Sequence, residues 1–355
     1  GCTYRGAAPP RALPVTDSSA AAPRVVVHPF APFVRALGRG KTAGRALDEH
    51  EAEQAFGMIL NGQATDAQTG AFLMLLRFKE ETVAEMAGMV RAARSHITAP
   101  PHGIPIDLDW PSYAGKRQHH PWYLLSALLL AGSGLRVLMH GCGPHANDRL
   151  FAEQALTELG IAPACSWPEA IAHLAKGSFA YLPLRIISPA LQQLMDKRAE
   201  FGLRSPVNTI IRHIDPGHAR TGLRSLHHPA YARLHAETAV ALDQSAVGVF
   251  RGEGGECEIR PDADTVVSLA SGAGQQTLNL SRRLAQRALK PDVARTAPLR
   301  TLWDDVAPNG YGLEAVLQTA AVALLCAGAA GEPVAAREAA NELWKQRGQW
   351  PGGTT

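Results

Sequence analysis

Cationic side chains able to bind phosphate gather in three segments of this 355-residue chain. In residues 116–123 they stand beside aromatic rings, in residues 197–228 they occur with few acids, and a third group spans residues 282–290. Such combinations hold single-stranded nucleic acid, with phosphates on the cations and bases stacked on the rings. The residues expected to contact nucleic acid are Lys116, Arg117, His120, Arg204, Arg212, Arg220, Arg224, Arg283, Arg287 and Lys290.

Each segment also has an interpretation without a ligand. Trp122 and Tyr123 fit either a stacking surface or the start of a buried helix, whereas Lys116 and Arg117 are expected to be exposed. The third segment is expected to place Arg283, Arg287 and Lys290 on one helix face, which also suits a solvated basic surface. Because the net charge is only +3, attraction to a polyanion has to come from these local clusters.

The remaining reactive residue types do not form a metal or nucleophile motif. The five cysteines are scattered and lack C-x-x-C spacing, which argues against a disulfide framework or a zinc site. Cys142 is expected to be a small packed thiol, and His140 to order the end of a strand. Residues 252–255 lack the P-loop and dinucleotide-binding patterns, so we expect a turn there.

Length and composition predict two domains of a soluble α/β protein. A single core usually stops growing near 250–300 residues, and 46% hydrophobic with 19% charged residues is typical of this class. The two longest apolar stretches, residues 123–134 and 313–331, are expected to be buried helices rather than membrane spans. Residues 1–28 are expected to be a flexible leader without signal-peptide features, and a reducing cytoplasm is the expected location.

Residues 29–98 are predicted to form a compact all-helical domain. Three capping boxes mark helix starts, because a side-chain acceptor is followed three residues later by Glu or Gln. They are Asp48 with Glu51, Thr65 with Gln68, and Thr82 with Glu85. Residues 99–105 contain three prolines and are predicted to be a linker.

Residues 106–355 are predicted to form a larger domain in which strands and helices alternate. Strands are expected at residues 106–109, 136–140, 179–182 and 245–250, and helices at residues 121–131, 148–160, 168–175, 189–201 and 230–242. This alternation indicates a mostly parallel central sheet flanked by helices.

The chain resembles anthranilate phosphoribosyltransferase, of glycosyltransferase family 3. The likeness covers about residues 46–262 and rests on residues 60–74, Met139-His140-Gly141, and residues 159–161, 198–205 and 208–216. It implies the nucleoside phosphorylase type of phosphoribosyltransferase fold, in which part of the later chain completes the small helical domain.

The resemblance fails at the positions that would hold the phosphoribosyl donor. A Gly-Thr-Gly-Gly-Asp loop in that family lets backbone amides approach the pyrophosphate, because glycine has no Cβ. Here Pro111 has no amide to donate, and Trp110 and Tyr113 fill the volume. We therefore expect no catalytic residue and a degenerate donor site. Its positions are Asp109, Trp110, Pro111, Ser112, Tyr113, Ser126, His140 and Asn208.

The sequence Asp-Trp-Pro-Ser-Tyr at residues 109–113 is similar to the YbiB-type group of this family. That likeness implies a homodimer paired through the helical domain, which binds DNA or RNA without sequence preference and without a known transferase reaction. We expect single strands to be preferred, gripped by basic loops and by the rings of Trp110, Tyr113 or Trp122, with no cofactor.

An alternative is a glycosyl or phosphoribosyl transferase with a remodelled site. It would use magnesium with phosphoribosyl pyrophosphate, and Arg204 and Asn208 would lie near the acceptor. Glu256 and Glu258 resemble the magnesium-binding Asp-Glu pair of the family, and Mg²⁺ prefers carboxylate oxygens.

Overall fold

The N-terminal helices begin where their capping residues predict. In the computed structural model, which describes residues 26–40, 43–98, 104–144, 146–271 and 273–352, all three capping boxes are present. The helices are α1 (Ala31–Gly38), α2 (Glu49–Leu60), α3 (Asp66–Lys79) and α4 (Val83–Ser95). The expected leader up to residue 25 and most of the expected linker, residues 99–103, lie outside the described residues.

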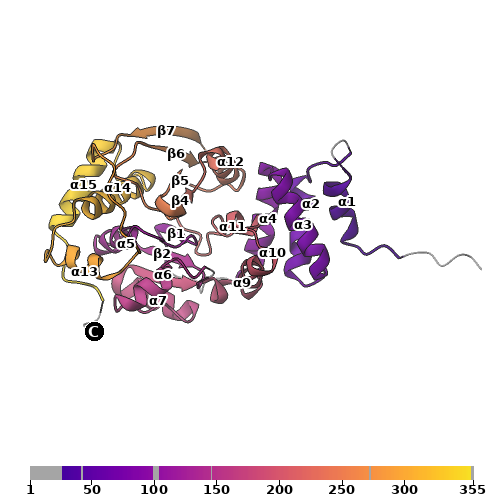
Figure 1. Ribbon diagram of the computed structural model, residues 1–355, viewed down its shortest axis with the longest axis horizontal. Helices are drawn as coiled ribbons and strands as arrows, with labels where there is room; N and C mark the ends of the chain where they lie inside the picture. The colour runs from indigo at the N-terminus through magenta and orange to yellow at the C-terminus, as the bar shows by residue number, and fades with distance from the viewer. Residues whose placement is uncertain (1–25, 41–42, 99–103, 145, 272, 353–355) are drawn as a thin grey trace, which may run out of the picture.

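Part of the later chain completes this helical domain, as the resemblance implied. Phe30, Phe56 and Phe72 are fully buried in a cluster that also contains Leu191 and Val207. The later helices involved are α9 (Pro189–Asp196), α10 (Arg198–Phe201) and α11 (Val207–Ile210). Figure 1 shows them between the sheet and the first four helices.

A seven-stranded sheet with the order β3-β2-β1-β4-β5-β6-β7 forms the larger domain. The strands are β1 (Leu108–Ser112), β2 (Val137–Gly141), β3 (Phe179–Pro183), β4 (Thr221–Leu226), β5 (Val247–Arg251), β6 (Thr265–Ser271) and β7 (Gly274–Leu280). The pairs from β3 through β5 are parallel, while β6 and β7 are antiparallel, which confirms the predicted mostly parallel sheet.

Helices cover both faces of the central part of the sheet (Figure 1), so β1 to β4 are buried on both sides, whereas most of the edge strand β7 is exposed. Val137 and Met139 of β2 join one hydrophobic cluster, while Leu138 between them joins the other. The helices are α5 (Tyr123–Gly132), α6 (Ala152–Glu158), α7 (Trp167–Gly177), α8 (Leu184–Ile187), α12 (Ala232–Ala241), α13 (Ala297–Trp303), α14 (Gly310–Cys326) and α15 (Pro333–Lys345). Helices α5 and α14 are the two apolar stretches predicted to be buried, and they are.

Pro111 is accommodated inside β1 because that strand is paired unevenly. All of β1 pairs with β2, but β4 pairs only with Leu108 and Asp109. Beyond Asp109 the Pro111 carbonyl accepts a hydrogen bond from Cys257 Sγ at 3.6 Å, where β4 no longer pairs with β1. Proline in a sheet is tolerated where its missing N–H interrupts no ladder bond.

Three sequence predictions of secondary structure were wrong. Residues 221–226, interpreted as part of a basic loop, form the central strand β4. The helix expected at residues 148–160 begins only at Ala152, because Leu150 exchanges backbone hydrogen bonds with Lys116. Residues 281–292 contain no helix, because the amides of Arg283 and Leu284 bond to the carbonyl of Pro261.

Within the described ranges, no helix has both the length and the apolar composition needed to cross a bilayer.

Gly312 on α14 permits close packing of that helix on Trp122. A Cβ on Gly312 would lie 2.7 Å from the buried indole ring, whereas one on Gly310 would meet nothing within 4 Å. We expect Gly312→Ala to lower the free energy of unfolding by about 1–3 kcal/mol through overpacking. Urea denaturation measures it, and Gly310→Ala is the matched control. Equal stabilities of the two variants would contradict the prediction.

Candidate functional site

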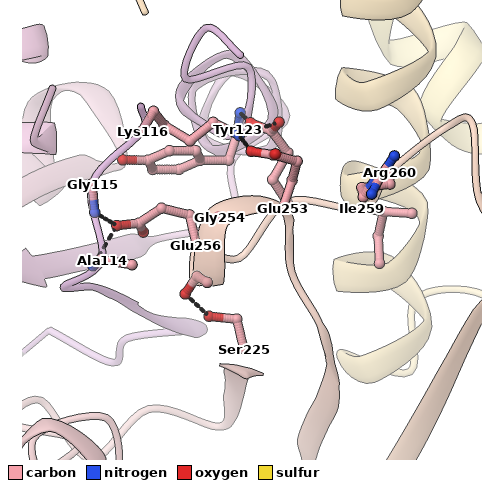
Figure 2. Close-up of polar contacts among 12 residues, drawn as sticks. Ala114, Gly115, Lys116, Tyr123, Ser225, Glu253, Gly254, Glu256, Ile259 and Arg260 are labelled. Atoms are coloured by element: carbon pink, nitrogen blue, oxygen red, sulfur yellow. Dashed lines mark hydrogen bonds and ion pairs between the residues drawn. The ribbon is translucent and has the colours of Figure 1, made fainter. Parts of the chain in front are cut away.

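The segment that follows β1 is bound by a carboxylate of the protein itself. Glu256 Oε1 accepts hydrogen bonds from the amides of Ala114, at 2.7 Å, and Gly115, at 2.6 Å. Figure 2 shows Glu256 directed at these two amides from the loop that follows β5. The Glu256 side chain is fully buried. These two amides follow the position of the family's phosphate loop, and they already have an anionic partner in the Glu256 carboxylate.

Lys116, one residue further, is buried between two more carboxylates of the same loop. Its Nζ forms ion pairs with Glu253 and with Glu258, the latter at 2.7 Å, and the other oxygen of Glu258 accepts from the Tyr123 amide at 2.9 Å. Neither Lys116 nor Glu258 has any exposed side-chain surface. The predicted exposure of Lys116 was wrong, because buried carboxylates require a paired cation.

The three charges of this group, Lys116, Glu253 and Glu258, set one another's protonation. Burial alone would lower the pKa of Lys116, but the two carboxylates outweigh burial and raise it, so the ammonium stays charged. Burial would raise the pKa of Glu253, but the Lys116 ammonium outweighs burial and lowers the pKa of this carboxyl. At Glu258 burial prevails over Lys116 and raises the pKa to about 7. The group approaches neutrality when Glu258 is protonated.

A second buried network lies under the ends of β1, β2 and β4. Arg224 Nη1 donates to Asp109 Oδ2 at 2.7 Å, the other oxygen of Asp109 bonds to His140 Nε2 at 2.9 Å, and His140 Nδ1 bonds to the Tyr113 hydroxyl at 2.6 Å. Burial raises the pKa of Asp109, but Arg224 and His140 outweigh it and lower the pKa. Arg224 is fully buried in a central strand, so its predicted contact with nucleic acid was wrong.

The aromatic rings proposed to stack on bases are inaccessible. Trp110, Tyr113, Trp122 and Tyr123 are all at most 2% exposed, so the stacking prediction was wrong and the buried-helix interpretation of residues 122–123 is confirmed.

Three more of the predicted site residues are bound inside the protein. The His120 ring is buried and its Nδ1 accepts from the Arg295 amide at 3.1 Å. The Ser112 hydroxyl bonds to that of Tyr123 at 3.0 Å, and the Ser126 hydroxyl donates to the Val316 carbonyl at 3.0 Å. These side chains stabilise the packing of the fold. Because the His120 ring is buried, the prediction that it contacts nucleic acid was wrong.

Five arginines converge near the helical domain without a carboxylate partner in the described part of the chain. We call them the arginine cluster: Arg77, Arg149, Arg198, Arg204 and Arg212. Arg149 donates to the carbonyls of Ala114 and Gly115, and Arg212 to Ser225 Oγ and the Gly255 carbonyl. Burial, together with repulsion from the other four, lowers the pKa of Arg204 to about 10. The five arginines concentrate positive charge, and the Glu81 carboxylate beside Arg77 offsets part of it.

A cavity of about 210 Å³ opens beside this cluster, between α3 and the ends of the central strands. Its lining includes four of the predicted site residues, Tyr113, Arg204, Asn208 and Arg212, and adds Arg77, Glu81 and His227. The Asn208 side chain accepts from the Ser205 amide at 3.2 Å, so it stabilises the start of α11. Burial, then repulsion from His228 and Arg204, lowers the pKa of His227.

The other predicted cations lie apart from this cavity. Arg117 is exposed, as predicted, and pairs with Asp148 at 3.2 Å, while Arg220 precedes β4 and pairs with Asp107 at 3.7 Å. Arg283 pairs with Glu314 at 3.6 Å in the segment that lacks the expected helix. Arg287 and Lys290 are exposed in the same segment, which is held by the bond from the Ala288 amide to Asp262.

Sequence reasoning missed Arg77, Arg149 and Glu253 as members of the site. Arg77 belongs to a helix whose other residues indicated only packing, and Arg149 was assigned to the start of the helix predicted at residues 148–160. Glu253 was considered only as part of a turn. The turn itself is confirmed, since residues 253–255 form a single 3₁₀ turn with Gly254 at φ 68°.

The expected packing of Cys142 and His140 is also observed. Cys142 is 1% exposed, and burial raises the pKa of its thiol to about 12, which makes it a poor nucleophile at neutral pH. His140 links two strands through Asp109 and Tyr113.

Comparisons with known proteins give a consistent picture. The sequence profile described as glycosyl transferase family, helical bundle domain, matches residues 33–97. Uncharacterized protein YbiB of Escherichia coli K12 is 28% identical over 73% of this chain and 82% of its own. Anthranilate phosphoribosyltransferase of Methylobacterium nodulans is 31% identical over 82% of this chain and 89% of its own.

Solved structures share the fold at lower identity. Anthranilate phosphoribosyltransferase from Thermus thermophilus has a TM-score of 0.70 and 23% identity, covering 90% of this chain and 98% of that one. The enzyme from Saccharomyces cerevisiae in complex with PRPP and Mg has a TM-score of 0.69 and 15% identity, covering 90% and 95%.

The raised pKa of Glu258 predicts a pH dependence of stability. A carboxyl whose pKa rises on folding, here from 4.5 to about 7, favours the folded state while protonated. Its contribution is complete below pH 4.5 and is lost as the pH rises through about 7. We expect the unfolding free energy of the wild type to fall between pH 5 and 8, relative to Glu258→Gln, by on the order of 1–3 kcal/mol.

Calorimetric unfolding across that pH range measures this difference. Glu51→Gln is the matched control, because Arg45 lowers the pKa of the Glu51 carboxyl to about 2 and it stays ionised throughout. Parallel pH profiles for the wild type and Glu258→Gln would contradict the prediction.

Proposed function

The chain belongs to the anthranilate phosphoribosyltransferase family, and within that family we propose that it binds nucleic acid instead of transferring a phosphoribosyl group. The observation that carries the proposal is the arginine cluster. Four guanidinium groups repel that of Arg204, and none of the five forms an ion pair with a carboxylate within the described residues. A ligand with several negative charges relieves that repulsion, and a phosphodiester backbone supplies them in series.

The cavity beside the cluster favours a single strand over a duplex. Its volume of about 210 Å³ suits the sugar-phosphate backbone of one strand. A duplex, with its major and minor grooves, would stay outside the cavity. Trp110, Trp122 and Tyr123 are buried, whereas His227 and Tyr231 line the cavity and are at least partly exposed. Contact is expected mainly through phosphates at the arginines, with these two rings beside them. Binding without sequence preference follows, since phosphate contacts carry no base information.

The transferase alternative requires a donor and a metal that the residues at the strand ends do not fit. Pro111 has no amide to donate, and the amides of Ala114 and Gly115 are bound to Glu256. The carboxylates of Glu253 and Glu258 are bound to Lys116. Both sets of contacts would have to break before phosphoribosyl pyrophosphate and Mg²⁺ could use these groups.

The direct test is fluorescence anisotropy of a labelled single-stranded oligonucleotide over a range of salt concentrations. We expect Arg204→Ala to weaken binding about 5- to 10-fold and to reduce the salt slope by about 0.7, the share of one phosphate contact. Arg204 suits this test because no hydrogen bond or ion pair with a described residue depends on it.

Arg220→Ala is the matched control. Arg220 is exposed and lies just before the start of β4, whereas the cavity lies beside the end of that strand. This substitution should leave affinity unchanged. Absence of wild-type binding at micromolar protein in low salt would refute the proposal. So would saturable calorimetric binding of phosphoribosyl pyrophosphate with Mg²⁺, which would favour the transferase.

We also propose that the protein is a homodimer paired through its helical domain. Phe78 near the end of α3 is 86% exposed, and a large aromatic side chain so exposed on a helix is typical of an interface. Phe78→Glu should convert the dimer to a monomer in size-exclusion chromatography with light scattering. Val306→Glu, at an exposed apolar residue of the other domain, should not. A wild-type monomer would contradict this proposal.

A further inference from the structure

Another cavity, of about 280 Å³, lies on the sheet face that packs against α12. Val249 of β5 is paired with Ser268 of β6. Arg251, two residues further along β5, is paired with Leu226 of β4. Side chains of paired residues, and of residues two apart on a strand, leave a sheet on the same face. All four residues line the cavity, and Ala232, the first residue of α12, borders it, so it lies where the helix begins to cover this face.

The lining of this cavity combines apolar side chains with two exposed arginines. Leu226 and Val249 are buried, and Val266 of β6 lines the cavity with 58% of its surface exposed. Arg251 and Arg287 also line it and are exposed. Neither arginine forms an ion pair or a side-chain hydrogen bond with another described residue. Such a lining is complementary to a ligand that has an apolar body and a negative charge.

The acids around the cavity already have partners. Asp264 lines the cavity, but its carboxylate pairs with Arg282 at 2.8 Å. Asp262 pairs with Arg260 at 2.8 Å, and it is close enough to Arg287 for their charges to interact without an ion pair between them. An anion that enters the cavity would therefore meet two guanidinium groups without displacing a carboxylate from either of them.

We propose that this cavity binds a small amphipathic carboxylate, with its hydrocarbon body on Leu226 and Val249 and its acid group at Arg251 and Arg287. A guanidinium group matches the geometry of a carboxylate and binds it through paired hydrogen bonds. A single acid group suits the site better than a polyphosphate, because the acids nearby would repel further negative charge. The proposal does not rest on nucleic-acid binding, since the arginine cluster borders a different cavity.

The volume of the cavity limits the size of this ligand. A cavity of about 150 Å³ is large enough to take up benzene. With about 280 Å³, this one has room for a hydrocarbon body of roughly six to eight carbon atoms together with its acid group.

Octanoate is the probe, titrated calorimetrically into the full-length protein. We expect one octanoate to bind per chain with a Kd of about 1 mM or lower. Octanol has the apolar body without the charge, and acetate has the charge without the body. Each should bind at least about 10-fold more weakly than octanoate, because each lacks one of the two interactions.

Two variants test the arginines, and one serves as their control. Arg287→Gln and Arg251→Gln should each weaken octanoate binding about 5- to 10-fold through the loss of one charge-assisted contact. Both side chains are exposed and unpaired among the described residues, so these variants are expected to fold. Arg233→Gln is the matched control, because Arg233 is an exposed arginine of α12 that does not line the cavity. It should bind octanoate like the wild type.

The proposal is overturned if the wild type does not bind octanoate saturably, or if octanol binds as tightly. It is also overturned if both glutamine variants bind octanoate like the wild type, because the ligand would then lie elsewhere. Weaker oligonucleotide binding by Arg287→Gln, without octanoate binding by the wild type, would assign Arg287 to nucleic acid instead. Octanoate is titrated without an oligonucleotide, so this inference and the proposed function can fail separately.

Discussion

Charges removed from water must find partners inside the protein, and this constraint shapes the carboxyl ends of the central strands. Lys116, Glu258, Asp109 and Arg224 are all buried there, and each unpaired charge would cost several kcal/mol. Their partners come from the loop that follows β5 and from neighbouring strands. The path of that loop is set by these pairs, and it passes so close to itself that a Cβ on Gly252 would lie 1.7 Å from the Glu256 carbonyl oxygen.

The carboxyl ends of parallel strands are where open α/β sheets usually bind ligands. Here the protein's own side chains satisfy the polar groups at that position: Glu256 binds the amides after β1, and Lys116 binds the acids of the facing loop. The fold of the anthranilate phosphoribosyltransferase family is retained, but the groups that could contact a diphosphate and a metal are bound to one another.

The arginine cluster lies beside this closed region. Arg149 and Arg212 donate to carbonyls of the two loops that meet there, while Arg77 extends from the helical domain. A ligand bound by these arginines would therefore contact both domains at once. Its anionic groups would also stabilise the contact between α3 and the larger domain.

The sequence by itself determined the elements whose signals are local. The capping boxes at Asp48, Thr65 and Thr82 depend on residues three positions apart, and the apolar run after Trp122 predicts a buried helix without knowledge of its neighbours. The missing amide of Pro111 is likewise a property of the residue alone. These features account for the starts of three N-terminal helices and for the buried helix α5.

Only the tertiary structure decided which cationic side chains have a buried carboxylate partner and which do not. Lys116 and Arg224 have the same chemistry as Arg204, but their carboxylate partners are 142 and 115 residues away in the chain, so no local pattern indicates that they are neutralised. The spacing of Arg283, Arg287 and Lys290 suggested a helix, but long-range bonds to Pro261 and Asp262 hold that segment in another form. Electrostatic pairing acts through space, so only the fold shows which arginines lack an ion-pair partner.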